Sequence, residues 1–361
     1  MAAMTMNPTK PPSSDAGSTS LPLALTMGDP AGIGLELALA AWQRRHEDNS
    51  PVFVVYGSAA ALRDRAGAVG LNLSLELIDD PLRAPAVFGR ALPVIDIALA
   101  APARQGVADP ANGVAVIAAI ERAVADTVSG RAAAVVTNPI AKSVLYQAGF
   151  THPGHTEFLA ALAERHLPGG PYHPVMMIAS EALRVVPLTI HIALADVPRA
   201  ISTDGILATV RIMEAALRRD FSIARPRIAV TGLNPHAGED GAMGREEIDI
   251  ITPAIAALRR EGLDITGPHP ADTLFHAERR HTYDAVLGMY HDQVLIPAKT
   301  LAFDTGVNVT LGLPFVRTSP DHGTAFDIAG TGRASPSSLI AALRLAAQMS
   351  AARTGQMAPA S

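Results

Sequence analysis

The chain has 361 residues, of which 48% are hydrophobic, 17% charged and 4% aromatic, and its formal net charge is −5. This length and apolar content predict a globular protein of two lobes, because single cores stop growing near about 250–300 residues. The chain has no cysteine, which excludes disulfides, thiolate metal sites and a cysteine nucleophile, and its scattered Lys and Arg and few aromatics argue against nucleic-acid binding.

The two ends of the chain differ in composition from the rest. Residues 1–20 are rich in Pro, Ser and Thr and lack the apolar core of a signal peptide, so we expect a disordered extension. We expect a flexible tail over residues 353–361. No apolar run in the sequence reaches membrane-spanning length. These features predict a cytoplasmic protein with no membrane partner.

Apolar runs alternate with helical patterns through the first part of the chain. Strands are predicted at 23–26, 51–56, 73–78, 92–97 and 132–136. Helices are predicted over 35–45, after an N-cap at Ser58, and from a cap at Asn112 to Ser129. This alternation indicates a mostly parallel α/β sheet. The glycine-rich turn Gly28–Gly34 is read equally well as an anion-binding loop or as a tight turn that needs glycine for packing.

Two polar motifs follow the strand at 132–136. The first is TNPIAK, which ends at Lys142, and the second is GHTEF, which opens a helix that we expect to run to Arg165 with Thr156 as its cap. His155 at this helix start is placed to meet a phosphate or a carboxylate. Taken alone, the motif is explained better by a surface histidine in a loop.

Three histidines share one position relative to predicted strands. The apolar runs 185–190, 228–233 and 285–289 are followed by His191, His236 and His291 respectively. In open α/β sheets, ligands bind beyond the carboxyl ends of the strands. Three imidazoles are a complete protein ligand set for an open divalent-metal site. The pattern therefore predicts a metal site.

Other polar residues of this region have plainer explanations. Six histidines lack the strand-end position, and we expect them at the surface: His46, His166, His173, His269, His276 and His281. Asp272 is either a partner of a ligating histidine or a helix cap. Glu246 and Glu247 open a helix that runs to Arg260, where acidic side chains complement the helix dipole and need no further role.

The segment Gly288–Gly332 places many polar groups among short apolar runs. Lys299, Asn308 and Arg317 lie on or near the predicted strands 307–311 and 315–316, and we expect them to converge on an anion such as a phosphate. A glycine-rich loop over 321–332 follows. Pro336 then starts a final helix with apolar spacing over 339–349.

A set of motifs in this order resembles the 4-hydroxythreonine-4-phosphate dehydrogenases of pyridoxal phosphate biosynthesis: TMGDPAGIG, VVTNPIAK, HPGHTEFLA, GLNPHAGEDGAMGREE, PADTLF, MYHDQ and GVNVTLGLPFVRTSPDHGTAFDIAG. The resemblance runs from about Leu23 to Met349. It implies two α/β/α lobes of the isocitrate and isopropylmalate dehydrogenase type, with the active site in the cleft between them and at a dimer interface. The expected lobes are 21–150 with 310–352, and 151–309 with the metal site.

The resemblance also implies roles for single residues. His191, His236 and His291 hold one divalent metal ion, Zn²⁺ in the first place or Co²⁺, Mg²⁺ or Mn²⁺, and the site is shared between the subunits of a homodimer. The substrate-binding residues are His155, Thr156, Lys299, Asn308 and Arg317. The loop that binds NAD or NADP contributes His322, Gly323, Thr324 and Asp327. The candidates for the proton acceptor are Asp272, Asp292 and Lys142.

The implied reaction oxidises the C3 hydroxyl of 4-phosphohydroxy-L-threonine with NAD or NADP, and loss of CO2 then gives 3-amino-2-oxopropyl phosphate. Alternatives are a related dehydrogenase of erythronate or threonate 4-phosphate or of a dihydrodiol, an enzyme resembling phosphate acyltransferases, and a metabolite-binding protein without catalysis. The three histidines argue against acyl transfer. So does the segment HGTAFDIAG, which resembles the loop that holds the adenosine of NAD in isocitrate and isopropylmalate dehydrogenases. The full set of expected polar groups argues against a mere binding protein.

Overall fold

The computed structural model describes residues 20–355, so most of the expected N-terminal extension and residues 356–361 of the expected tail lie outside the described residues. The described chain builds a single 12-stranded sheet in the order β3-β4-β2-β1-β5-β12-β11-β6-β7-β10-β8-β9. Most neighbouring strands are parallel, and antiparallel pairs occur where β11 meets β12 and β6 and where β6 meets β7. The predicted, mostly parallel α/β sheet is therefore confirmed.

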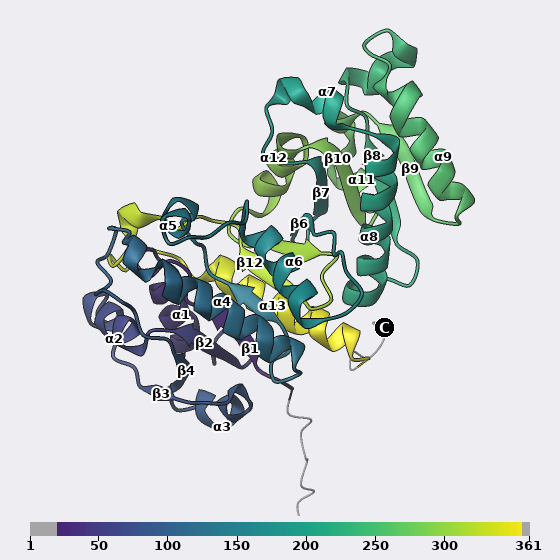
Figure 1. The fold of residues 1–361 in the computed structure, drawn as a ribbon. Helices are drawn as coiled ribbons and strands as arrows, with labels where there is room; N and C mark the ends of the chain where they lie inside the picture. Colours follow the sequence, from purple (N-terminus) through teal and green to yellow (C-terminus); the bar gives the residue numbers. More distant parts are fainter. Residues whose placement is uncertain (1–19, 356–361) are drawn as a thin grey trace, which may run out of the picture.

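One half of the sheet is built from the beginning of the chain and from a strand near its end (Figure 1). Its strands are β1 (Leu23–Thr26), β2 (Phe53–Gly57), β3 (Leu75–Leu77), β4 (Leu92–Asp96), β5 (Val135–Thr137) and β12 (Arg317–Pro320). Its helices are α1 (Gly34–Gln43), α2 (Ala59–Ala68), α3 (Ala84–Phe88), α4 (Gly113–Val128), α5 (Lys142–Gln147), α6 (His155–His166) and α13 (Ser337–Arg353). Strands β1, β2 and β5 are buried along their whole length, as continuous apolar strands covered on both faces must be.

The other half of the sheet comes from the middle of the chain (Figure 1). Its strands are β6 (Val175–Ala179), β7 (Arg184–Thr189), β8 (Arg227–Thr231), β9 (Asp264–His269), β10 (Ala285–Tyr290) and β11 (Val307–Leu311). Its helices are α7 (Val197–Ala200), α8 (Thr203–Phe221), α9 (Thr252–Arg260), α10 (Ala271–Leu274), α11 (Ala277–Arg280) and α12 (His291–Ala302). Because β11 pairs with both β6 and β12, it joins the two halves into one sheet.

The three predicted helix caps differ in outcome. Ser58 caps α2 by accepting a hydrogen bond from the Ala61 amide at 3.2 Å, as predicted. Asn112 occupies the cap position of α4, as predicted, but its side chain does not bond that helix and instead accepts from the Ala101 amide. The prediction for Thr156 is wrong, because α6 starts at His155 with Gly154 in the cap position.

The end of α13 is fixed to the body of the protein. This helix extends past the predicted segment to Arg353, whose guanidinium bonds the buried carboxylate of Asp220 on α8. Within residues 20–355, no helix is both long and apolar enough to cross a bilayer.

Candidate active site

The three strand-end histidines come from neighbouring strands. Strand β10 lies between β7 and β8 and is parallel to both, so the carboxyl ends of all three strands meet at one edge of the sheet. His191 follows β7, His291 follows β10 as the first residue of α12, and His236 lies in the loop after β8. The structure thus gives the three residues the shared topological position that the apolar runs predict.

Two of the three histidines face each other. The ring centroids of His191 and His291 are 5.7 Å apart. His291 donates from Nδ1 to the Asp292 carboxylate at 2.7 Å, which orients the ring of His291. Burial, together with the charges of His291 and Lys142, lowers the pKa of His191 and so favours its neutral form. Neutral imidazoles with free lone pairs are the form that binds divalent metals.

His236 does not join this pair within one chain. It is exposed and sits in a turn of left-handed backbone, with φ of 52°. Among the described residues, no group of three or more His, Asp or Glu side chains comes together in a way that could hold a metal ion. A single chain therefore presents two of the three predicted ligands as a pair and the third apart from them.

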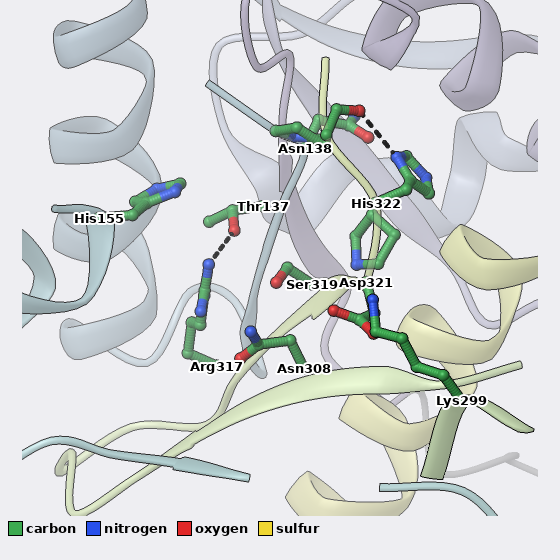
Figure 2. A pocket seen from close by; sticks show the side chains of 12 residues that line it. Thr137, Asn138, His155, Lys299, Asn308, Arg317, Ser319, Asp321 and His322 are labelled. Atoms are coloured by element: carbon green, nitrogen blue, oxygen red, sulfur yellow. Dashed lines mark hydrogen bonds and ion pairs between the residues drawn. The ribbon is translucent and has the colours of Figure 1, made fainter. Parts of the chain in front are cut away.

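The predicted anion-binding residues line a cavity of about 350 Å³ between the two halves of the sheet. Figure 2 shows His155 at one side, Lys299 at the opposite side, and Arg317 and Asn308 between them. The nucleotide-loop residues His322 and Gly323 line the same cavity. Thr156, predicted beside His155, is not among the lining residues. The sequence does not assign a role to four further polar residues that line the cavity: Thr137, Asn138, Ser319 and Asp321.

Arg317 is a buried cation without a carboxylate partner among the described residues. Its side chain donates to the Thr137 hydroxyl at 2.7 Å and to the Thr310 hydroxyl at 2.9 Å, and Nε has no partner. The residue is only 4% exposed, and burial lowers its pKa to about 10. Two neutral hydroxyls do not balance a buried charge, so this position favours an anion.

His155 meets the same cavity from the start of α6. Its Nε2 atom is shut off from solvent and has no hydrogen-bond partner among the described residues. Burial, and then the charges of Arg317 and Lys142, hold the pKa of His155 well below its usual value. The ring is therefore neutral at pH 7, and Nε2 is open to a hydrogen bond from or to a ligand.

Lys299 supplies the second cation of the cavity. It forms an ion pair with Asp321 at 3.0 Å, which fixes its ammonium group at the cavity wall. The Asn138 side chain donates to the Thr26 and Gly34 carbonyls, while its Oδ1 atom is buried and unpartnered within the described chain. Figure 2 places these groups around one space, so the cavity combines cations with hydrogen-bonding groups.

The nucleotide-loop candidates pack against the glycine-rich turn Gly28–Gly34. The Ile33 amide donates to the Thr324 carbonyl at 3.0 Å, and a Cβ on Gly32 would come within 2.7 Å of that same carbonyl oxygen. Close packing thus explains the glycine at this position, which the sequence left open. His322 Nε2 is buried and unpartnered among the described residues, Gly323 has open space around it, and Asp327 is exposed.

The three candidates for the proton acceptor lie in different places. Asp292 is 72% exposed at its side chain and bonds His291. Asp272 and Asp292 line a separate surface hollow against α12. The exposed Lys142 has its Nζ beside Gly154, and its charge lowers the pKa of both His155 and His191. Lys142 is therefore the candidate whose charge acts on both the cavity and the histidine pair.

Two interpretations of this region from the sequence need correction. His269 does have a strand before it, since it ends β9, and it is partly buried with Nε2 2.9 Å from the Thr266 hydroxyl. The other five histidines expected at the surface are exposed. Glu247 does more than complement a helix dipole, because its buried carboxylate accepts hydrogen bonds from the backbone of the loop that carries His236.

Comparisons with known proteins show the family to which this chain belongs. Residues 49–346 match the family model for the pyridoxal phosphate biosynthetic protein PdxA. A 4-hydroxythreonine-4-phosphate dehydrogenase of Xanthobacter autotrophicus is 55% identical over 93% of this chain and 97% of its own length.

Two solved structures of dehydrogenases have folds similar to that of this chain. A 4-hydroxythreonine-4-phosphate dehydrogenase from Klebsiella pneumoniae has a TM-score of 0.81 at 39% identity, over 92% of this chain and 100% of its own. A terephthalate 1,2-cis-dihydrodiol dehydrogenase from Burkholderia xenovorans has a TM-score of 0.61 at 29% identity, over 91% of this chain and 98% of its own. The chain therefore belongs to the PdxA family of 4-hydroxythreonine-4-phosphate dehydrogenases and is an oxidoreductase.

Proposed function

We propose that this protein oxidises 4-phosphohydroxy-L-threonine at C3 with NAD or NADP, with the help of one divalent metal ion, and that the product loses CO2 to give 3-amino-2-oxopropyl phosphate. The observation that supports this most directly is Arg317, a buried cation that faces a cavity and has no carboxylate partner within the described chain. The substrate carries a phosphate and a carboxylate, and either one supplies the missing negative charge.

The cavity offers separate contacts for two anionic groups. Arg317 Nε and His155 Nε2 are unpartnered on one side, and the Lys299 ammonium stands on the other. Asn308 lines the space between them. A substrate with an anion at each end fits this division, because each end then meets a cation. These contacts fix the position of C3 and exclude water from the buried side of the cavity.

The histidine pair fits a divalent metal ion by its donor chemistry. The rings of His191 and His291 lie 5.7 Å apart, and Asp292 holds the ring of His291 by accepting a hydrogen bond from Nδ1. His236 is exposed, so it is free to complete the set from a second subunit. When bound, the metal supplies a Lewis acid that stabilises negative charge on the substrate oxygen. Zn²⁺ suits three imidazoles, and Co²⁺, Mn²⁺ or Mg²⁺ remain alternatives.

An exposed apolar surface beside the histidine pair supports a homodimer with shared sites. The outer face of α12, which begins with His291, carries Ile296 at 64% exposure, and Phe303 next to the helix is 76% exposed. Large apolar side chains clustered at a surface favour burial against a partner. A second copy that covers this face brings its own residues next to the His191–His291 pair.

The proposed chemistry consists of an oxidation followed by a decarboxylation. The C3 hydroxyl gives its proton to a base and C3 gives a hydride to the oxidised nicotinamide. The resulting β-keto acid then breaks the bond to its carboxylate to release CO2, and the enolate that remains takes up a proton on the carbon that carried the carboxylate. Lys142 is our choice of base, because it is the candidate whose charge acts on both His155 and His191; it takes the proton in the form in which its own ammonium has already lost one. Asp292 orients His291, and Asp272 faces the hollow outside α12.

The nicotinamide cofactor fits beside the substrate cavity. His322 offers a buried, unpartnered Nε2, and Gly323 leaves open space at the cavity wall. The exposed Asp327 and the partly exposed Thr324 belong to the same loop. His322 and Gly323 line the same cavity as the substrate contacts, which supports a cofactor next to the substrate, as hydride transfer requires.

The test is a substrate panel followed by NADH and NADPH absorbance. We expect turnover with 4-phosphohydroxy-L-threonine, and loss of turnover when the protein is stripped of metal by a chelator. The panel also contains erythronate 4-phosphate, threonate 4-phosphate and a terephthalate dihydrodiol, the last because of the 29% identical dehydrogenase. Faster turnover of any of these compounds would reassign the substrate, and turnover unaffected by metal removal would remove the metal from the proposal.

A further inference from the structure

The loop after β8 contains a rare run of left-handed backbone. His236, Ala237, Glu239 and Asp240 all have positive φ, between 40° and 53°, and Gly238 between them has φ of 80°. Side chains of L-residues disfavour this region, and consecutive non-glycine residues rarely occupy it. Such a turn persists only where its surroundings hold it in place.

The carboxylate of Glu247 is the group that holds this turn at its base. Glu247 Oε1 accepts from the backbone amides of Leu233 and Asn234, each at 2.8 Å, and Oε2 accepts from the Asn234 side chain at 3.0 Å. Glu247 is 3% exposed, so these hydrogen bonds are shielded from water. A buried carboxylate that accepts several hydrogen bonds fixes its donors firmly, because breaking them would leave it unsatisfied.

The turn is built closely around this carboxylate. A Cβ at Gly238 would lie 2.5 Å from Glu247 Oε2, so only glycine lets the left-handed turn approach the carboxylate. Gln293, two residues after His291, donates to the Gly232 carbonyl at 2.8 Å and accepts from the Thr231 hydroxyl at 2.8 Å. The loop of His236 is therefore tied at its start to the helix of His291, and just before the left-handed turn, at Leu233 and Asn234, to Glu247.

We propose that Glu247 is a positioning residue for the metal site: it holds the left-handed turn that sets where His236 stands, without touching metal or substrate itself. The inference rests on the proposed role of His236 as a ligand. A ligand held by a rigid turn needs less ordering when the metal arrives, so loss of the carboxylate weakens metal binding while the ligand set remains intact.

The test measures binding of Co²⁺ alone to the metal-stripped, full-length protein, followed by its visible absorption. We expect Glu247→Gln to weaken Co²⁺ binding about 10-fold or more, the scale known for residues that support metal ligands. Asp249→Asn is the matched control, since Asp249 lies in the same helical turn but pairs with exposed Arg245, and we expect unchanged binding. With substrate, kcat of Glu247→Gln should recover as Co²⁺ is raised, whereas His236→Ala should stay impaired.

His236→Ala separates this inference from the function on which it rests. If His236→Ala binds Co²⁺ as tightly as the unmodified protein, the ligand assignment itself fails. If His236→Ala weakens binding but Glu247→Gln does not, the ligand stands and the positioning role is overturned. Should Glu247→Gln fail to fold, Asn234→Ala removes the side-chain donor to Glu247 instead. Weaker Co²⁺ binding by that variant supports the proposal, and unchanged binding overturns it.

Discussion

The charge of Arg317 is the feature of the cavity with the largest energetic consequence. Its only described acceptors are the hydroxyls of Thr137 and Thr310, so the ligand-free protein keeps a guanidinium out of water without a counter-charge. Replacement of such a group by an apolar side chain of similar length is often neutral or stabilising. The same replacement removes the contact that an anionic substrate needs. Stability and binding are thus expected to move in opposite directions at this residue.

We therefore expect Arg317→Met to raise KM for the phosphorylated substrate by about 10- to 100-fold, since a hydrogen bond to a charged group contributes about 1.5–3 kcal/mol. The melting temperature of the ligand-free protein should stay the same or rise. Steady-state kinetics and thermal unfolding measure the two effects. Arg245→Met is the control, because Arg245 forms an exposed pair with Asp249 and should change neither quantity. An unchanged KM, or a large drop in melting temperature, would show that Arg317 is structural.

At the scale of secondary structure, α13 depends on a buried ion pair at its last turn. Asp220 is almost fully buried and bonds both Arg219 and Arg353, and Arg353 also donates to the Pro314 carbonyl at 2.9 Å. Burial alone would raise the pKa of Asp220, but the hydrogen bonds and charges of the two arginines outweigh it and leave the pKa below its usual value. The carboxylate is therefore charged and dependent on both partners.

Arg353→Met should lower the free energy of unfolding by about 1–3 kcal/mol, because it leaves a buried carboxylate with one arginine in place of two. Urea denaturation at pH 7 measures this change. Asp249→Asn, which breaks only an exposed pair, should cost less than about 0.5 kcal/mol. Equal losses in the two variants would contradict the idea that the last turn of α13 is anchored through Asp220.

The strands that the sequence predicts differ in composition and burial from those that it misses. β2, β7 and β10 are continuous apolar runs, and their burial on both faces makes the sequence signal strong. β9 was not predicted, because its sequence DITGPH contains Gly and Pro and it pairs with a single neighbour at the sheet edge. β6 was also missed, since its short run VMMIA follows a stretch rich in Pro and Gly.

The residues of the candidate site also divide into those that the sequence reveals and those that only the fold brings together. Lys299, Asn308, Arg317 and His155 are polar residues in an apolar setting, and that contrast is visible in the sequence. The left-handed turn at His236 is not visible in the sequence, because four of its residues are ordinary L-residues held by contacts from elsewhere in the chain. The sequence alone explains Glu247 as an acidic residue that complements a helix dipole. Its actual partner is the loop after β8, and only the fold brings that loop near. Thr137 and Asn138 lie in a motif seen in the sequence, where Lys142 alone was given a role.

At the scale of the whole molecule, one continuous sheet carries both the substrate cavity and the histidine pair, and His236 remains outside the pair. If a homodimer completes the site, each metal takes His191 and His291 from one subunit and His236 from its partner. This division has a consequence for mixed dimers, because a subunit that lacks His236 still owns an intact pair. A subunit that lacks His291 still owns an intact His236.

Refolding or slow exchange of His236→Ala with His291→Ala should therefore restore activity that neither variant has alone. In an equal mixture half of the dimers are mixed and one of their two sites is complete, so about a quarter of the sites should recover. His191→Ala mixed with His291→Ala is the matched control, because both changes damage the same pair and every site of the mixed dimer stays incomplete. Recovery in the first mixture alone assigns His236 to the partner subunit, whereas no recovery in either would place all three histidines of a site on one chain. Recovery in the control would mean that His191 and His291 of one site come from different subunits. That result would contradict the pairing inferred from the 5.7 Å between their rings.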